Sequence, residues 1–172
     1  MKFGVHLPQC GAQASPDAIM RHAVRADALG LSDVWVSEHI VLPEDAPYPD
    51  TAVFYDPVVT LGWIASATKR VRLGTSVLVL PMRHPLPLAK ELGTLQTLSG
   101  GRLILGAGVG WCEPEFEALG APFRRRGRRM DETIALMRKA WTQDPFDHDG
   151  RDVPDRKSTR LNSSHVSESR MP

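Results

Sequence analysis

Short apolar runs alternate with longer amphipathic runs along most of the chain. The strand-like runs, rich in β-branched and aliphatic residues, lie at residues 2–7, 33–36, 71–77 and 103–107. The runs with helical periodicity lie at about residues 16–29, 57–68, 85–99 and 128–141. This alternation is typical of βαβ units and a parallel sheet, so the pattern predicts an α/β fold.

Two of the predicted helices carry a clear N-terminal signal. Ser15 precedes Pro16, and Asp56 precedes Pro57. A serine or aspartate at the N-cap accepts a hydrogen bond from a helix amide, and proline is favoured at the first helical position. Gly30 is placed to end the first helix. The apolar stripe predicted for that helix consists of Ala18, Ile19, Ala23, Val24, Ala26 and Leu29.

Four βα units are visible, and they fit the N-terminal half of a TIM-like (β/α)8 barrel, which needs eight units in about 250 residues. A four-stranded open α/β sheet is the alternative. For half a barrel we expect parallel strands in chain order with helices on the outer face only, whereas a doubly wound sheet would carry helices on both faces. For half a barrel, we expect apolar residues on the inner face to lie open, and the candidates are Val34, Val36, Leu73 and Leu105.

Composition excludes several classes of protein. Of the 172 residues, 42% are hydrophobic and 24% are charged, which suits a globular unit with a core. No apolar run approaches the roughly 20 residues that span a bilayer, and no secretory leader opens the chain, so we expect a cytoplasmic protein without a membrane partner. The formal net charge of +1 gives no reason to expect nucleic acid.

The two cysteines, Cys10 and Cys112, have no cysteine or histidine partner at metal-ligand spacing. We therefore expect free thiols and no metal site.

The composition changes abruptly near Asp155. Residues 155–165 have no helical or strand period, and they match the in-frame translation of a sequencing-library adapter, as residues 169–172 do. An ordinary disordered tail is the alternative. We expect one unit over residues 1–154 and a non-native, disordered tail over residues 155–172.

Polar residues follow the predicted strands, where parallel sheets of this kind carry their active sites. They are His6 after the first strand, Ser37-Glu38-His39 after the second, Ser76 after the third and Trp111 after the fourth. A histidine titrates near neutrality and can move a proton, and a neighbouring carboxylate can orient it or hold a ligand. Glu38 and His39 could instead only cap the following turn.

Two further segments leave alternatives open. Residues 106–110 have the spacing Gly-x-Gly-x-Gly, which is not the dinucleotide fingerprint. They could bring backbone close to a flat ligand or form a plain turn. The basic run at residues 124–129 could be a solvated face or an anion site.

Several motifs in order resemble those of one superfamily. They are Ser37-Glu38-His39, residues 74–85, residues 100–103, residues 106–111, Glu115-Phe116 and Leu119-Gly120. Over about residues 1–150 the chain resembles the luciferase-like monooxygenase superfamily, in particular its oxidoreductases that depend on the deazaflavin coenzyme F420.

The resemblance implies a barrel that holds the cofactor ring at its C-terminal mouth. It implies a non-proline cis peptide at Ser76-Val77 and a proton-donating catalytic residue, His39. His6 and Trp111 would lie on the substrate side. The cofactor-binding residues would be Glu38, Ser76, Val77, Val79, Val109 and Gly110.

The implied activity is hydride transfer between reduced coenzyme F420 and a small organic substrate. The alternatives are an FMN-dependent monooxygenase that uses dioxygen, and an inert truncated fragment. We expect the full-length parent to be a homodimer and this chain alone to be inactive. The chain departs from the sugar-phosphate dehydrogenase branch, in which an acid follows the Gly-x-Gly turn, because Trp111 stands there.

Overall fold

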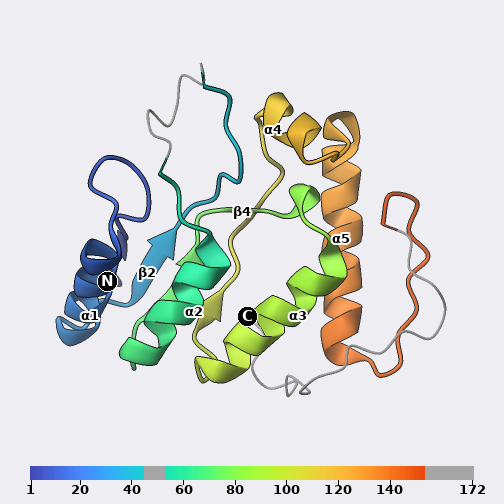
Figure 1. Ribbon diagram of the computed structural model, residues 1–172. Helices are drawn as coiled ribbons and strands as arrows, with labels where there is room; N and C mark the ends of the chain where they lie inside the picture. The colour runs from blue at the N-terminus through green and yellow to red at the C-terminus, as the bar shows by residue number, and fades with distance from the viewer. Residues whose placement is uncertain (45–52, 154–172) are drawn as a thin grey trace. The chain divides into compact units, whose positions relative to one another are not determined.

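The computed structural model describes residues 1–44 and 53–153 (Figure 1). The chain divides into two compact units. The first unit comprises Met1–Leu78 and Leu98–Ala107, and the second comprises Val79–Thr97 and the chain from Gly108 onward. The predicted tail at 155–172 lies outside the described residues.

The first unit is built on a four-stranded parallel sheet. Its strands are β1 (Gly4–His6), β2 (Asp33–Val36), β3 (Arg72–Thr75) and β5 (Leu103–Ile104), in the order β1-β2-β3-β5. All three pairings are parallel. The predicted fold class and strand order are therefore confirmed, and the order is that of successive βα units in half a TIM-like barrel.

Two helices of the first unit, α1 (Pro16–Ala28) and α2 (Pro57–Ala67), begin at the predicted caps. The Ser15 hydroxyl accepts from the Ala18 amide at 3.2 Å, and the Asp56 carboxylate accepts from the Val59 amide at 2.9 Å. The helices contact each other, and α1 contacts β2 while α2 contacts β3. They therefore cover the same face of the sheet (Figure 1).

The apolar stripe of α1 was predicted correctly only in part. Ala18, Ile19, Ala23 and Ala26 are buried. Val24 and Leu29 are 42% and 60% exposed, so their placement in the core was wrong. They lie at the edge of the apolar stripe, where helical periodicity alone does not determine whether a side chain is buried.

The assignment of inner-face residues on the sheet was also wrong. Val34, Val36 and Leu73 are fully buried rather than open, and Val34 pairs with Leu73 in register. Residues paired in register share a face, so these side chains lie together on the side that the helices cover. Alternation along a strand separates two faces, but it does not say which one the helices pack against.

The opposite face carries Trp35, which pairs in register with His6 and Gly74. A Cβ atom on Gly74 would lie 2.3 Å from a ring carbon of Trp35, and one on Gly4 would lie 2.6 Å from Nε1 of the indole. The indole therefore lies across the backbone of both neighbouring strands, where only glycine leaves room for it.

The predicted fourth strand is interrupted. β5 ends at Ile104, and a separate strand β6 (Ala107–Gly108) pairs with β4 (Leu78–Val79). Between β5 and β6, the Gly106 amide donates to the Thr75 hydroxyl at 3.0 Å, and that hydroxyl donates to the Gly106 carbonyl at 2.9 Å. The Gly106 carbonyl also accepts from the Leu78 amide at 2.8 Å, so Gly106 is held by both a side chain and the backbone of β4.

The second unit contains nearly all of α3 (Pro85–Leu98), together with α4 (Glu113–Ala118) and α5 (Arg126–Thr142). Single-turn helices at Leu80–Met82 and Phe123–Arg125 precede α3 and α5. The Trp141 indole donates to the Ala89 carbonyl at 2.8 Å and joins α5 to α3. The short helix α4 was not predicted, because six residues with Pro114 among them show no full helical period.

The helices among the described residues include none that is both long enough and apolar enough to cross a membrane.

Candidate active site

The carboxyl ends of β1, β2 and β3 meet at one edge of the parallel sheet. His6 ends β1, Ser37 follows β2 and Ser76 follows β3. The Leu7 amide donates to the Trp35 carbonyl at 2.8 Å, and the Ser76 amide donates to the Val36 carbonyl at 2.7 Å. The structure therefore brings together at this edge the predicted residues that follow the first three strands.

His6 and Ser37 are joined by their side chains. Nε2 of His6 lies 3.0 Å from the Ser37 hydroxyl, and Nδ1 lies 3.3 Å from the Leu7 carbonyl. The imidazole of His6 is exposed. These two contacts orient the imidazole at the end of β1, and the ring remains accessible to solvent.

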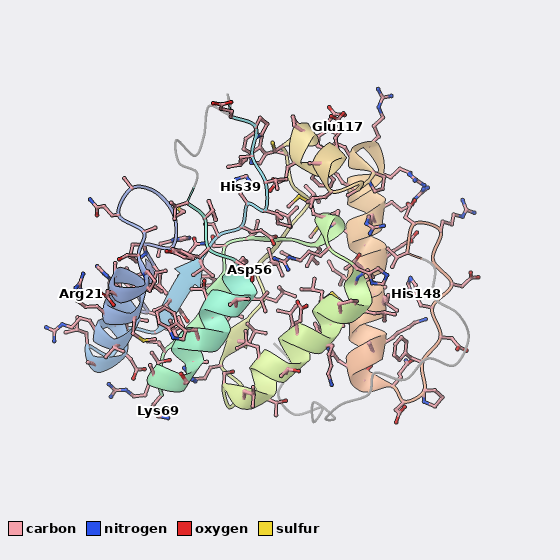
Figure 2. All side chains as sticks on the ribbon, viewed as in Figure 1. Arg21, His39, Asp56, Lys69, Glu117 and His148 are labelled. Atoms are coloured by element: carbon pink, nitrogen blue, oxygen red, sulfur yellow. The ribbon has the colours of Figure 1, made fainter. Side chains whose placement is uncertain are left out.

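Glu38 and His39 differ in their environment. Glu38 is only 4% exposed, whereas His39 is half-buried. The His39 ring packs edge-on against Phe54, with ring centroids 5.4 Å apart and an interplanar angle of 84°. Figure 2 shows His39 in the segment that leads away from β2. The contact with Phe54 orients the His39 imidazole and leaves the ring partly exposed to solvent.

The peptide bond between Ser76 and Val77 is cis, as the resemblance implied. Both residues are exposed, and Val77 is 40% exposed. The preceding residue, Thr75, is buried and holds Gly106 through its hydroxyl. The segment after β3 thus exposes the hydroxyl of Ser76 and the aliphatic side chain of Val77, and the bonds of Thr75 to Gly106 fix the strand end that precedes them.

Gln9 is a residue at this edge that the sequence did not single out. Its side chain is fully buried, and its amide contacts Ser37 and Tyr55. These partners lie 28 and 46 residues away, so no local motif could have indicated them.

In the second unit, Val79 and Gly110 lie against each other. Gly110 has a φ of 77°, and a Cβ atom there would lie 2.7 Å from Cγ1 of Val79 and 2.7 Å from a ring carbon of Phe116. Val79 and Phe116 also belong to one buried cluster with Met82. The turn at Gly110 is therefore closed to any residue with a side chain.

Val109 and Trp111 flank Gly110 and are 43% and 58% exposed. Each of them offers an apolar surface outside the buried cluster. The two groups of predicted site residues thus belong to different units.

The basic run at residues 124–129 contributes to the structure of the second unit. Nε of Arg126 donates to the Gly110 carbonyl at 3.1 Å, and its guanidinium lies 4.0 Å from the centroid of the Phe123 ring. Arg125 donates to the buried carboxylate of Asp152 at 2.6 Å, and Arg128 contacts the same carboxylate. Arg129 donates to the Pro81 carbonyl at 2.8 Å. Arg124, Arg125 and Arg128 are exposed, as a solvated face requires, but the run also bonds to other parts of the second unit. Arg126 supports the turn at Gly110.

The family comparison agrees with this arrangement of strands and motifs. The family model described as luciferase-like monooxygenase matches residues 1–166. The chain belongs to the luciferase-like monooxygenase family.

One relative in this family is an F420-dependent glucose-6-phosphate dehydrogenase of Amycolatopsis mediterranei. It is 38% identical over 144 residues, which cover 80% of this chain and 41% of the relative. The chain spans about half the length of the curated relatives it matches.

Two solved structures of luciferase-like enzymes are also similar. An F420-dependent secondary alcohol dehydrogenase, in complex with an F420-acetone adduct, has a TM-score of 0.75 and 25% identity, with 98% of this chain and 51% of that chain covered. The oxygenating constituent of 3,6-diketocamphane monooxygenase from Pseudomonas putida, in complex with FMN, has a TM-score of 0.72 and 26% identity, with 88% of this chain and 42% of that chain covered. The family therefore includes both deazaflavin and flavin enzymes.

Proposed function

We propose that this chain is the N-terminal part of an oxidoreductase that transfers a hydride between coenzyme F420 and a small organic substrate. The observation that carries the proposal is the meeting of His6, the Ser37–His39 segment and Ser76 at one edge of the sheet. The F420-dependent relatives named above support a deazaflavin as the cofactor.

The residues at this edge suit a flat, polar heterocycle. The hydroxyls of Ser37 and Ser76 and the imidazole of His39 can hydrogen-bond to its rim, and the exposed side chain of Val77 can contact its face. We assign cofactor contacts to Glu38, Ser76 and Val77 in the first unit. In the second unit we assign them to Val79, Val109 and Gly110 on the basis of the family motif, and the exposed side chain of Val109 offers an apolar contact.

When bound, the reduced deazaflavin supplies a hydride. For a carbonyl substrate, this hydride would bond to the carbonyl carbon, and the electrons of the C–O π bond would move to the oxygen. His39 then gives a proton to the oxygen, and the product is an alcohol. In the opposite direction, His39 would accept the hydroxyl proton, and the hydride would pass from the carbinol carbon to the oxidised deazaflavin. His6 and Trp111 contact the substrate, and the packing of His39 on Phe54 orients the ring for proton transfer.

A second candidate function is an FMN-dependent monooxygenase that uses dioxygen. The likeness to the FMN complex of 3,6-diketocamphane monooxygenase favours it. The homodimeric state and the cytoplasmic location of the parent stay predictions.

The experiment is a turnover assay of the parent enzyme, expressed from a complete reading frame. It is supplied with reduced F420 and a panel of small ketones, or with oxidised F420 and the matching alcohols. The proposal predicts a change in F420 absorbance that depends on substrate but not on dioxygen. Dioxygen consumption with reduced FMN, and no turnover of F420, would support the monooxygenase instead.

A further inference from the structure

Gln9 follows β1, and its side-chain amide forms three hydrogen bonds at the edge of the sheet. The side chain is fully buried. Nε2 donates to the Ser37 carbonyl at 2.9 Å and to the Tyr55 carbonyl at 3.0 Å. Oε1 accepts from the Ser37 amide at 3.0 Å. Both amide hydrogens and the carbonyl oxygen are thus engaged.

These bonds extend the pairing of β2 by one residue. Both backbone groups of Ser37 are bonded to the Gln9 amide, as they would be by a neighbouring strand. Ser37 leads directly into Glu38 and His39. The start of the segment that carries His39 is therefore held by a side chain.

The bond from Gln9 to the Tyr55 carbonyl holds the segment that packs against the His39 ring. The Tyr55 amide donates to the Gln9 carbonyl at 3.1 Å, and the Tyr55 carbonyl accepts from the Gln9 side chain. Phe54, the residue before Tyr55, forms an isolated bridge with Cys10 and packs against the His39 ring. Gln9 therefore fixes both the backbone that leads to His39 and the aromatic ring on which His39 lies.

We infer that Gln9 is a positioning residue for His39, acting through Ser37 on one side and through Phe54 and Tyr55 on the other. The expected effect on turnover rests on the proposed function, whereas the expected effect on the position of His39 does not. A neutral amide is required, because the position needs two donated hydrogens and one acceptor at the same place. Methionine supplies neither, and a glutamate carboxylate can only accept.

The test compares Gln9→Met with the control Gln13→Met in the parent enzyme. Gln13 is an exposed glutamine in the same loop. The histidine rings are labelled with ¹³C, and the NMR signals of His39 are assigned by their loss in His39→Gln. Two quantities are measured: the chemical shifts of the His39 ring and the nuclear Overhauser effect between His39 and Phe54. Gln9→Met should shift the His39 signals and weaken that contact, whereas Gln13→Met should leave both as in the wild type.

Turnover provides the second readout. Gln9→Met should lower kcat by about 10- to 100-fold, because the catalytic group is misplaced. The Kd for the cofactor should rise by a smaller factor, since Ser37 and Glu38 in the same segment are proposed cofactor contacts. Gln9→Glu adds a pH signature. Its carboxyl regains one donated hydrogen when protonated, so its kcat relative to wild type should rise as the pH falls. A ratio that does not depend on pH would mean that the donated hydrogen has no effect on turnover.

The outcomes separate this inference from the proposed function. An unchanged His39–Phe54 contact in Gln9→Met would overturn the inference, whatever the turnover. If Gln9→Met does not fold, the pH dependence of Gln9→Glu decides, and a flat ratio overturns the inference. A parent enzyme without F420 turnover would contradict the proposed function, while the NMR comparison would still decide the role of Gln9.

Discussion

The Ser37 hydroxyl lies 3.0 Å from Nε2 of His6, so the ends of β1 and β2 are joined by side chains as well as by backbone. His6 is exposed and belongs to the proposed substrate side of the edge. This relationship places a histidine where a substrate could reach it while keeping its ring orientation defined.

Removing the His6 imidazole should weaken substrate binding more than it slows the chemistry. We expect His6→Ala in the parent enzyme to raise KM about fivefold with kcat within about threefold, since one hydrogen bond is worth roughly 1 kcal/mol. Steady-state kinetics would measure this, with His22→Ala on α1 as the control. A large fall in kcat with KM unchanged would instead make His6 a proton-transfer group.

Removing the His39 imidazole should mainly slow turnover. His39→Ala should lower kcat by roughly 10²–10⁴-fold, the usual contribution of a general acid. Cofactor binding should weaken much less, by about the roughly 1 kcal/mol of one hydrogen bond. The control is His84→Ala, an exposed histidine outside the proposed site. Unchanged turnover in His39→Ala would exclude the proton-donor role.

The turn at Gly110 should not tolerate a side chain. Gly110→Ala combines a positive φ with contacts of 2.7 Å to Val79 and Phe116, whereas Gly120 has a φ of 64° and nothing within 4 Å of an added Cβ atom. We expect Gly120→Ala to cost about 1 kcal/mol and Gly110→Ala about 2 kcal/mol more. Thermal unfolding of the two variants would measure the difference. Equal costs would mean that the packing around Gly110 yields easily.

Asp27 should make the stability of the first unit depend on pH in the acid range. Its carboxylate accepts from the amides of Lys69, Arg70 and Val71 at 3.2, 2.7 and 2.8 Å. Burial raises its pKa, but these bonds and the charge of Arg70 lower it further, so the net pKa lies below its usual value. The folded state then binds this proton less readily than the unfolded state does.

The stabilisation from Asp27 is therefore present above about pH 4 and is lost as the pH falls through the lowered pKa. Thermal midpoints of wild type and Asp27→Asn, measured between about pH 3 and pH 6, should converge toward the acid end. Asp17→Asn on the exposed start of α1 is the control. A constant difference across this range would show that the three bonds do not depend on the charge.

Residues 1–154 alone should bind neither coenzyme F420 nor FMN measurably, and should self-associate. The expectation follows from the match to about half of each relative's length and from the indole of Trp35, which is only half-buried on its face of the sheet. Strands at an open sheet edge also favour association. Analytical ultracentrifugation and cofactor titration would test this. A monomer that unfolds cooperatively and binds either cofactor with micromolar affinity would show that these βα units form a complete site.

Local signals were enough to predict most of the helices and strands. Ser15-Pro16 and Asp56-Pro57 fix where α1 and α2 begin, because capping depends on neighbouring residues only. The ends of parallel strands lie at one edge by topology, which is why His6, Ser37 and Ser76 could be grouped from the sequence.

The remaining features depend on distant contacts. Which face of β2 packs on the helices was wrongly predicted for Val34 and Val36, since both faces of this strand carry apolar residues. The break between β5 and β6 depends on Thr75, and the role of Gln9 depends on Ser37 and Tyr55. None of these pairings leaves a local pattern in the chain.

Binding of the two cofactors to the parent enzyme tests the central claim most directly, because it requires no knowledge of the substrate. Fluorescence titration should show that F420 binds with micromolar or tighter affinity, and that Gly110→Ala weakens this binding while Gly120→Ala does not. FMN should bind at least tenfold more weakly. Tight binding of FMN with no detectable binding of F420 would contradict the account.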